Sequence, residues 1–263
     1  MVLKLVATDL DGTLLHTDGT VTERTRAALT AVESLGVTVV FVTGRPVRWM
    51  EPLWEHVGDH GLAVCSNGGI VYDVAAHGVR SARPIPPDVG LQVAGLLREA
   101  MPGTAFAVES TTGFGREPEF LPRHEPPPGT RVGDLEKIFD DGTVKLLARH
   151  EERGPEEFWA ETEALVGHLV TTTWSSTGAL VEISGPGVTK ASTLALLCEE
   201  LGVAPEEVVA FGDMPNDLAM LRWAGTSYAM ANAHPSVVAL ADRQAPSHED
   251  DGVAAVLEEL FGL

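Results

Sequence analysis

The two ends of this chain carry a pattern that its middle lacks, and this division constrains the fold more than any other feature. Over residues 1–82, short continuous runs of Val, Leu and Ile alternate with longer amphipathic stretches. The pattern predicts strands at Leu3 to Thr8, Val37 to Val42 and Leu62 to Ser66, with helices at Glu23 to Leu35 and Val47 to Val57. Continuous apolar strands separated by helices are typical of a parallel sheet that is covered on both faces.

The same alternation returns after residue 187. It predicts helices at Ala191 to Leu201, Asp217 to Ala224, from Pro235 and at Val253 to Phe261, and strands at Val208 to Phe211 and Thr226 to Met230. Both ends of the chain are therefore expected to build one α/β domain from residues 1–82 and 188–263. Its expected architecture is a Rossmann-like, doubly wound parallel sheet.

The middle of the chain, residues 83–187, has a different texture and reads as an inserted α+β domain. Helices are expected at Asp88 to Ala100 and Glu156 to Val166, and strands at Ala105 to Glu109, Val144 to Arg149, Leu169 to Ser175 and Leu180 to Ser184. The proline-rich segment Pro118 to Gly129 is expected to be a loop.

Charge narrows the possible partners. The chain of 263 residues has a formal net charge of −20, which argues against nucleic acid, because its phosphates are held mainly by Lys and Arg. An acidic protein that acts on an anionic phosphate would need a local positive centre. A bound divalent cation and a few cationic side chains would supply one.

The sequence also bears on the cellular location of the protein. Its apolar stretches are too short for a membrane span, and the N-terminal run leading into Asp9 has no features of a signal peptide, so we expect a cytoplasmic protein. Cys65 and Cys198 are far apart in apolar surroundings, and we expect both to be buried free thiols.

Three polar clusters directly follow predicted strands. They are Asp9-Leu10-Asp11-Gly12-Thr13, Thr43-Gly44-Arg45 and Gly212-Asp213-Met214-Pro215-Asn216-Asp217. Each alone is also typical of turns or helix caps. In open parallel sheets, however, ligands bind beyond the carboxyl ends of the strands, so all three clusters should meet at one edge. Carboxylates at such an edge suit Mg²⁺, which prefers oxygen ligands.

The set Asp9-x-Asp11-Gly12-Thr13, Thr43-Gly44-Arg45, Lys190 and Gly212-Asp213-x-x-Asn216-Asp217 resembles the four motifs of the haloacid dehalogenase-like (HAD) superfamily. The insertion between the second and third motifs is similar to the large α+β (type IIB) cap of the Cof-type phosphatases. Three further segments match: Ser66-Asn67-Gly68-Gly69, Asn232-Ala233 and Glu249-Asp250-Asp251-Gly252-Val253.

The resemblance implies a mechanism in two steps. Asp9 would attack phosphorus and form an aspartyl-phosphate, and Asp11 would act as general acid and then general base. Mg²⁺ would be held by Asp9, Asp11 through its backbone carbonyl, Asp213 and Asp217. The residues expected to bind phosphate or substrate are Leu10, Thr43, Gly44, Lys190 and Asn216.

The sequence leaves open the role of Arg45 and the roles of several residues in the insertion. Arg45 either contacts substrate or pairs with the carboxylates near the site. The inserted cap would act as a lid and recognise the leaving group. Its candidate residues are Glu109, Arg116, His124, Lys145 and Trp174, most of which are also compatible with an ordinary surface role.

The expected function is Mg²⁺-dependent hydrolysis of phosphate monoesters of small metabolites. Sugar phosphates are the leading substrate class, ahead of phosphorylated cofactors. One alternative is a phosphomutase or phosphotransferase that passes the phosphoryl group of the same aspartyl-phosphate to a sugar hydroxyl. Another is a non-catalytic protein that binds phosphorylated ligands. The sequence does not specify an oligomeric state.

Overall fold

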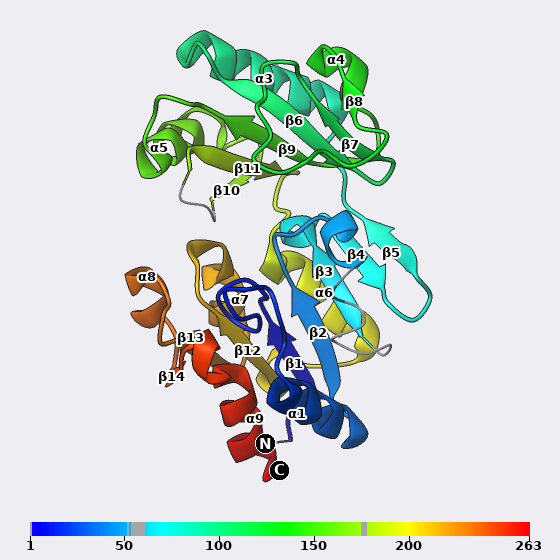
Figure 1. Ribbon diagram of the computed structural model, residues 1–263, viewed down its shortest axis with the longest axis vertical. Helices are drawn as coiled ribbons and strands as arrows, with labels where there is room; N and C mark the ends of the chain where they lie inside the picture. Colours follow the sequence, from blue (N-terminus) through cyan, green and yellow to red (C-terminus); the bar gives the residue numbers. More distant parts are fainter. Residues whose placement is uncertain (1, 52, 54–60, 175–177) are drawn as a thin grey trace. The chain divides into compact units, whose positions relative to one another are not determined.

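The computed structural model describes residues 2–51, 53, 61–174 and 178–263. The chain divides into two compact units (Figure 1). One unit consists of Met1–Ser81 and Thr189–Leu263, and the other consists of Ala82–Val188.

The first unit is built on an eight-stranded sheet in the order β14-β13-β12-β1-β2-β3-β4-β5. The strands are β1 (Leu5–Thr8), β2 (Thr38–Val42), β3 (Leu62–Cys65), β4 (Ile70–Asp73), β5 (Gly78–Ala82), β12 (Val208–Gly212), β13 (Thr226–Met230) and β14 (Arg243–Ala245). β1 lies at the centre, where it pairs in parallel with β2 on one side and β12 on the other. The predicted α/β fold with a parallel sheet core is confirmed.

One edge of this sheet departs from the expected pattern. β4 runs antiparallel to β3, and neither β4 nor β5 was predicted. The chain reverses in the turn between β3 and β4, where Ser66, Asn67 and Gly68 have φ values of 53°, 55° and 103°. Three successive residues in the left-handed region turn the backbone back onto β3 before a helix can form.

Helices cover both faces of the sheet. They are α1 (Glu23–Ser34), α6 (Lys190–Leu201), α7 (Leu218–Trp223), α8 (Pro235–Val238) and α9 (Gly252–Phe261). Along β1, Leu5 and Ala7 belong to the apolar cluster that includes α6 and α7. The alternate residue Val6 is equally buried, as expected for a strand between two layers. α1 packs against α9.

Local chemistry explains where these helices begin and end. Thr189 caps α6 through its side chain, which accepts from the Ser192 amide, and Gly202 ends the helix in a left-handed conformation. The predicted helix Val47 to Val57 begins as a 3-10 turn, Val47–Trp49, and the described residues Glu51 and Leu53 are helical. Its positions 52 and 54–57 lie outside the described residues.

The second unit is an α+β structure with a six-stranded sheet in the order β10-β11-β9-β6-β7-β8. Its strands are β6 (Ala105–Ser110), β7 (Gly113–Arg116), β8 (Arg131–Val132), β9 (Thr143–Arg149), β10 (Thr171–Thr173) and β11 (Leu180–Ser184). Its helices are α3 (Pro87–Ala100), α4 (Leu135–Ile138) and α5 (Pro155–Val166). The sequence did not predict β7, β8 or α4. The predicted strand Leu169 to Ser175 is seen as β10, and Ser175 lies outside the described residues.

Alternation along the strands of the second unit separates two faces. Phe106 and Val108 of β6 and Leu146 of β9 join an apolar cluster with α3 and α5, whereas Glu109 and Lys145 occupy the alternate positions. Residues 118–129 form a loop, as predicted.

Two further expectations concern the whole chain. Cys65 and Cys198 are both buried and free, as predicted. Among the residues that the structure describes, no helix is long and apolar enough to cross a membrane.

Candidate active site

The polar residues at the carboxyl ends of β1 and β12 lie next to each other in the first unit. Asp9 directly follows β1 and Asp213 directly follows β12, and these two strands are paired in parallel. Asp217 ends the short 3-10 helix Pro215–Asp217, and Lys190 is the first residue of α6. The parallel pairing explains why side chains some 200 positions apart share one site.

Lys190 lies between two carboxylates. Its Nζ donates to Oδ1 of Asp9 at 2.7 Å and to Oδ1 of Asp217 at 2.7 Å. The Lys190 side chain is 1% exposed and that of Asp217 is 0% exposed. An ammonium group this deeply buried needs its charge balanced, and the two carboxylates do so.

Backbone amides and a hydroxyl hold two further carboxylate oxygens. Oδ2 of Asp217 accepts from the amides of Asp213 and Met214, each at 3.1 Å. Oδ1 of Asp213 accepts from the Thr13 hydroxyl at 3.0 Å. Thr13 belongs to the first motif, but sequence reasoning gave it no role.

Gly12 permits the close approach of this loop to Asp213. Its φ is +75°, and a Cβ added there would lie 2.4 Å from Oδ2 of Asp213. Any side chain at this position would therefore be both strained and in collision with the carboxylate. This is the physical reason for glycine after Asp11.

The electrostatics of the cluster follow from its burial. Burial raises the pKa of Asp9 well above its ordinary value, an effect that Lys190 opposes and that Asp217 and Asp213 reinforce. Burial, followed by the charge of Asp217, raises the pKa of Asp213 to about 6. Burial works to lower the pKa of Lys190, but Asp217 and Asp9 outweigh it and raise that pKa.

The donor set suits a hard divalent cation. Asp9, Asp213 and Asp217 are buried, and one carboxylate oxygen of each lies within 4.8 Å of the others. Three ionised carboxylates around one ammonium leave a net charge of −2 at the site, which a divalent ion would neutralise. Oxygen ligands of this kind match Mg²⁺. The structure thus brings three of the four predicted metal ligands together.

Asp11 and Arg45 form a separate pair at the outer side of the site. Arg45 donates from Nε to Oδ2 of Asp11 at 2.8 Å and from Nη2 to Oδ1 at 2.5 Å. The Asp11 side chain is 58% exposed, so the carboxyl group remains open to solvent. Hydrogen bonding to Asp11 raises the pKa of Arg45. Of the two readings left open for Arg45, the structure shows the pairing with a carboxylate.

The predicted phosphate-binding residues occupy different places in the same unit. Thr43 is buried, and its hydroxyl accepts from the Arg45 amide at 3.0 Å, with Gly44 between them. The Leu10 side chain is fully buried, so only its backbone could contact a ligand. Its carbonyl accepts from the Thr13, Leu14 and Leu15 amides at 3.2, 3.0 and 2.9 Å.

Asn216 reaches a residue that the sequence did not single out for the site. Its Nδ2 donates to Oδ1 of Asn67 at 3.2 Å, and Asn67 lies in the left-handed turn after β3. Backbone strain of this kind is common near functional sites. The signal that could have identified Asn67 is its place in Ser66-Asn67-Gly68-Gly69, directly after a buried strand.

The five candidates of the second unit have unequal surroundings. Arg116 donates from Nη1 to the carbonyls of Glu117, Pro118 and Phe120, which ties it to the adjacent loop. Lys145 is 2% exposed, and its Nζ contacts Oε2 of Glu182 at 3.0 Å. Glu109 is the register partner of Lys145, His124 is exposed in the proline-rich loop, and Trp174 follows β10.

The chain matches known proteins over nearly its whole length. A family model described as haloacid dehalogenase-like hydrolase matches residues 6–257. The chain is 31% identical to the 5-amino-6-(5-phospho-D-ribitylamino)uracil phosphatase YitU of Bacillus subtilis, covering 98% of each chain. It is 30% identical to the pyridoxal phosphate phosphatase YbhA of Escherichia coli, covering 97% of each.

A solved structure extends the likeness to the fold of the whole chain. A sugar phosphatase of HAD subclass IIB matches with a TM-score of 0.80 over 98% of this chain and 99% of the other, at 20% sequence identity. At that identity the match shows a shared fold.

Proposed function

We propose that this chain, which belongs to the haloacid dehalogenase-like hydrolases and matches named phosphatases over nearly its whole length, is a Mg²⁺-dependent phosphomonoesterase whose nucleophile is Asp9. Small phosphorylated metabolites are its substrates, and sugar phosphates are the proposed class. The observation that carries the mechanism is the buried cluster of Asp9, Asp213 and Asp217 around Lys190.

The cluster supports nucleophilic attack by Asp9. A carboxylate must be ionised to attack phosphorus, and burial raises the pKa of Asp9, which disfavours the ionised form. Lys190 donates a hydrogen bond to Asp9 at 2.7 Å and so favours the ionised form. The resulting aspartyl-phosphate would then be hydrolysed by water.

Asp11 is the proposed proton donor to the leaving group. It is mostly exposed and lies two positions beyond the nucleophile, outside the carboxylate cluster. Arg45 orients its carboxyl group through two hydrogen bonds. General acid and base help of this kind typically contributes about 10²- to 10⁴-fold in rate.

Asp9, Asp213 and Asp217 are the side chains that would hold Mg²⁺, with the Asp11 carbonyl as a further ligand. When bound, the ion would neutralise charge on the phosphoryl oxygens. Lys190, the Thr43 hydroxyl and the backbone of residues 10 and 44 are proposed to contact those oxygens, with Asn216 at their edge.

Phosphate release from a panel of monoesters, measured with Mg²⁺ and with chelator, tests this proposal. We expect turnover that requires Mg²⁺, and its loss in Asp9→Asn. The matched control is Asp18→Asn, because Asp18 is an exposed residue between β1 and α1 whose side chain accepts from the Thr20 amide and hydroxyl. Turnover in Asp9→Asn equal to that of the unmodified protein would refute the proposed nucleophile.

Trapping the intermediate tests the mechanism separately. In Asp11→Asn the second step lacks its general base, whereas with p-nitrophenyl phosphate the first step hardly needs the acid, so acid-quenched enzyme given this ester should carry a phosphoryl group on the peptide that contains Asp9. Absence of that adduct while product still forms would contradict a covalent intermediate.

A further inference from the structure

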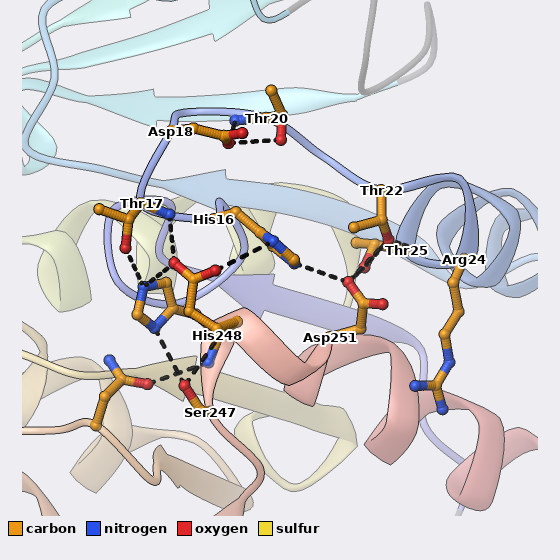
Figure 2. Close-up of polar contacts among 12 residues, drawn as sticks. His16, Thr17, Asp18, Thr20, Thr22, Arg24, Thr25, Ser247, His248 and Asp251 are labelled. Carbon is orange, nitrogen blue, oxygen red and sulfur yellow. Dashed lines mark hydrogen bonds and ion pairs between the residues drawn. The ribbon is translucent and has the colours of Figure 1, made fainter.

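The loop that follows the nucleophile is tied to two segments near the end of the chain (Figure 2). This loop, residues 12–22, joins the first motif to α1 and contains no strand or helix. Side chains from Asn232 and from residues 247–251 bind it at several points. We call Asn232 and residues 247–251 the clasp.

Asn232 connects both parts of this contact. Its Nδ2 donates to the Gly12 carbonyl at 2.8 Å, and its Oδ1 accepts from the His248 amide at 3.1 Å. One side-chain amide thus joins the backbone beside Asp11 to the backbone of the clasp. Both of its polar atoms are used, so its orientation is fixed.

The middle of the loop contacts two carboxylates of the clasp. The Thr17 amide donates to Oε1 of Glu249 at 2.8 Å. The two ring nitrogens of His16 face two carboxylates: Nε2 lies 3.0 Å from Oδ1 of Asp251, and Nδ1 lies 3.4 Å from Oε2 of Glu249. Figure 2 shows the His16 ring between these contacts.

Asp251 secures the far end of the loop, where α1 begins. Its Oδ1 accepts from the hydroxyls of Thr22 and Thr25 at 2.8 and 3.2 Å, and Thr22 is the N-cap of α1. Asp251 has a φ of 54°, a backbone conformation that a residue other than glycine adopts at a cost. Such a conformation persists when surrounding contacts require it.

These contacts bear directly on the candidate site. Gly12 lies between Asp11 and Thr13, and Thr13 donates to Asp213. The carbonyl to which Asn232 donates belongs to Gly12, where an added Cβ would lie 2.4 Å from Oδ2 of Asp213. A shift of Gly12 would therefore displace the Asp11 carboxyl group.

We infer that the clasp is a positioning device that holds the loop after the nucleophile so that Asp11 meets the leaving-group oxygen. Asn232 is its principal positioning residue. The inference rests on the proposed role of Asp11 as general acid.

Two substitutions test the hydrogen bonds of Asn232, one at Asn232 itself and one at its partner His248. Asn232→Ala removes both, and His248→Pro removes the amide that donates to Asn232. His248 is the first residue of a 3-10 helix, and Ser247 before it has φ −61° and ψ 154°, so proline fits there. His248→Ala keeps the amide and loses the side chain, which makes it the matched comparison.

The readout is kcat/KM for an alkyl phosphate and for p-nitrophenyl phosphate. An alkoxide leaving group needs the acid and a nitrophenolate hardly does, so a displaced Asp11 slows the alkyl ester selectively. We expect Asn232→Ala to lower kcat/KM for the alkyl ester about 10- to 100-fold and for the aryl ester less than about fivefold. His248→Pro should show the same selective loss relative to His248→Ala.

Thr20→Val provides the control for the loop itself. Thr20 donates to Asp18 at the tip of the loop, apart from the clasp, and kcat/KM should stay within about twofold for both esters. Equal losses on the two esters in Asn232→Ala, or no loss in either Asn232→Ala or His248→Pro, would overturn the inference. Asp9→Asn distinguishes failure of the clasp inference from failure of the proposed function. If Asp9→Asn is inactive while the clasp variants keep full activity, the clasp inference alone fails.

Discussion

Replacing Lys190 by methionine tests the buried cluster most directly. Methionine is unbranched and apolar, so Lys190→Met removes the ammonium and leaves Asp9 and Asp217 in place. Both contacts of Nζ are 2.7 Å long and lie in the interior. The substitution therefore leaves buried carboxylates without their cation in the metal-free protein.

The size of the effect follows from the two distances. At 2.7 Å and an effective dielectric constant of about 20, each contact contributes about 6 kcal/mol of Coulomb attraction. The cost of desolvating the ammonium, several kcal/mol, offsets much of the sum. The expected net loss in the free energy of unfolding is about 3–5 kcal/mol, as for other buried ion pairs that lose one partner.

Urea titration in the presence of chelator measures this loss near neutral pH. The deficit should shrink as pH falls, because a carboxyl group whose pKa is raised in the folded state destabilises that state only when ionised. The pKa of Asp9 is already raised in the unmodified protein, and loss of Lys190 should raise it further. Protonation of Asp9 at low pH should therefore stabilise Lys190→Met more than it stabilises the unmodified protein.

A second substitution separates charge from packing. Lys190→Met combined with Asp217→Asn should recover at least about 1 kcal/mol, since one uncompensated charge is removed while the asparagine oxygen still accepts from the backbone. Lys145→Met is the matched control, a buried lysine of the other unit, and its effect should add to that of Asp217→Asn. A loss below about 1 kcal/mol in Lys190→Met, or no recovery, would refute this reasoning.

Three further predictions concern other features of the first unit. Gly12→Ala should abolish Mg²⁺-dependent turnover, because its Cβ would lie 2.4 Å from Oδ2 of Asp213; turnover near that of the unmodified protein would contradict this packing. The pKa of Asp213, about 6, means that protons compete with Mg²⁺ at lower pH, so the rise in Tm on adding Mg²⁺ should be larger at about pH 8 than at about pH 5, and an equal rise would contradict it. Burial raises the pKa of Cys198 to about 11, so its thiol should resist a disulfide reagent at about pH 8 until urea unfolds the protein; rapid labelling of native protein would show otherwise.

The central part of the core sheet could be predicted because its strands are buried on both faces. β1, β2 and β12 are continuous apolar runs, and a sequence pattern reports such burial directly. β5 and β14 were missed for the opposite reason. β5 contains Arg80 and Ser81 and is largely exposed, and β14 has three residues, so neither carries an apolar run.

Convergence of the site residues also followed from strand order, but their pairings did not. The carboxyl ends of parallel neighbours must meet, which brings Asp9 to Asp213. Which carboxylate each cation contacts depends on side-chain geometry. Lys190, at the start of α6, donates to Asp217, and Arg45 donates to Asp11. No periodicity in the sequence encodes either pairing.

The central place of β1 has a consequence for synthesis of the chain. β1 gains β2 as a neighbour early, but its other neighbour, β12, begins only at Val208. The whole unit Ala82–Val188 is made before that point, and in the part of the chain that the structure describes its six strands pair with one another. During synthesis on the ribosome, the inserted unit can therefore fold before β12 has been made to pair with β1.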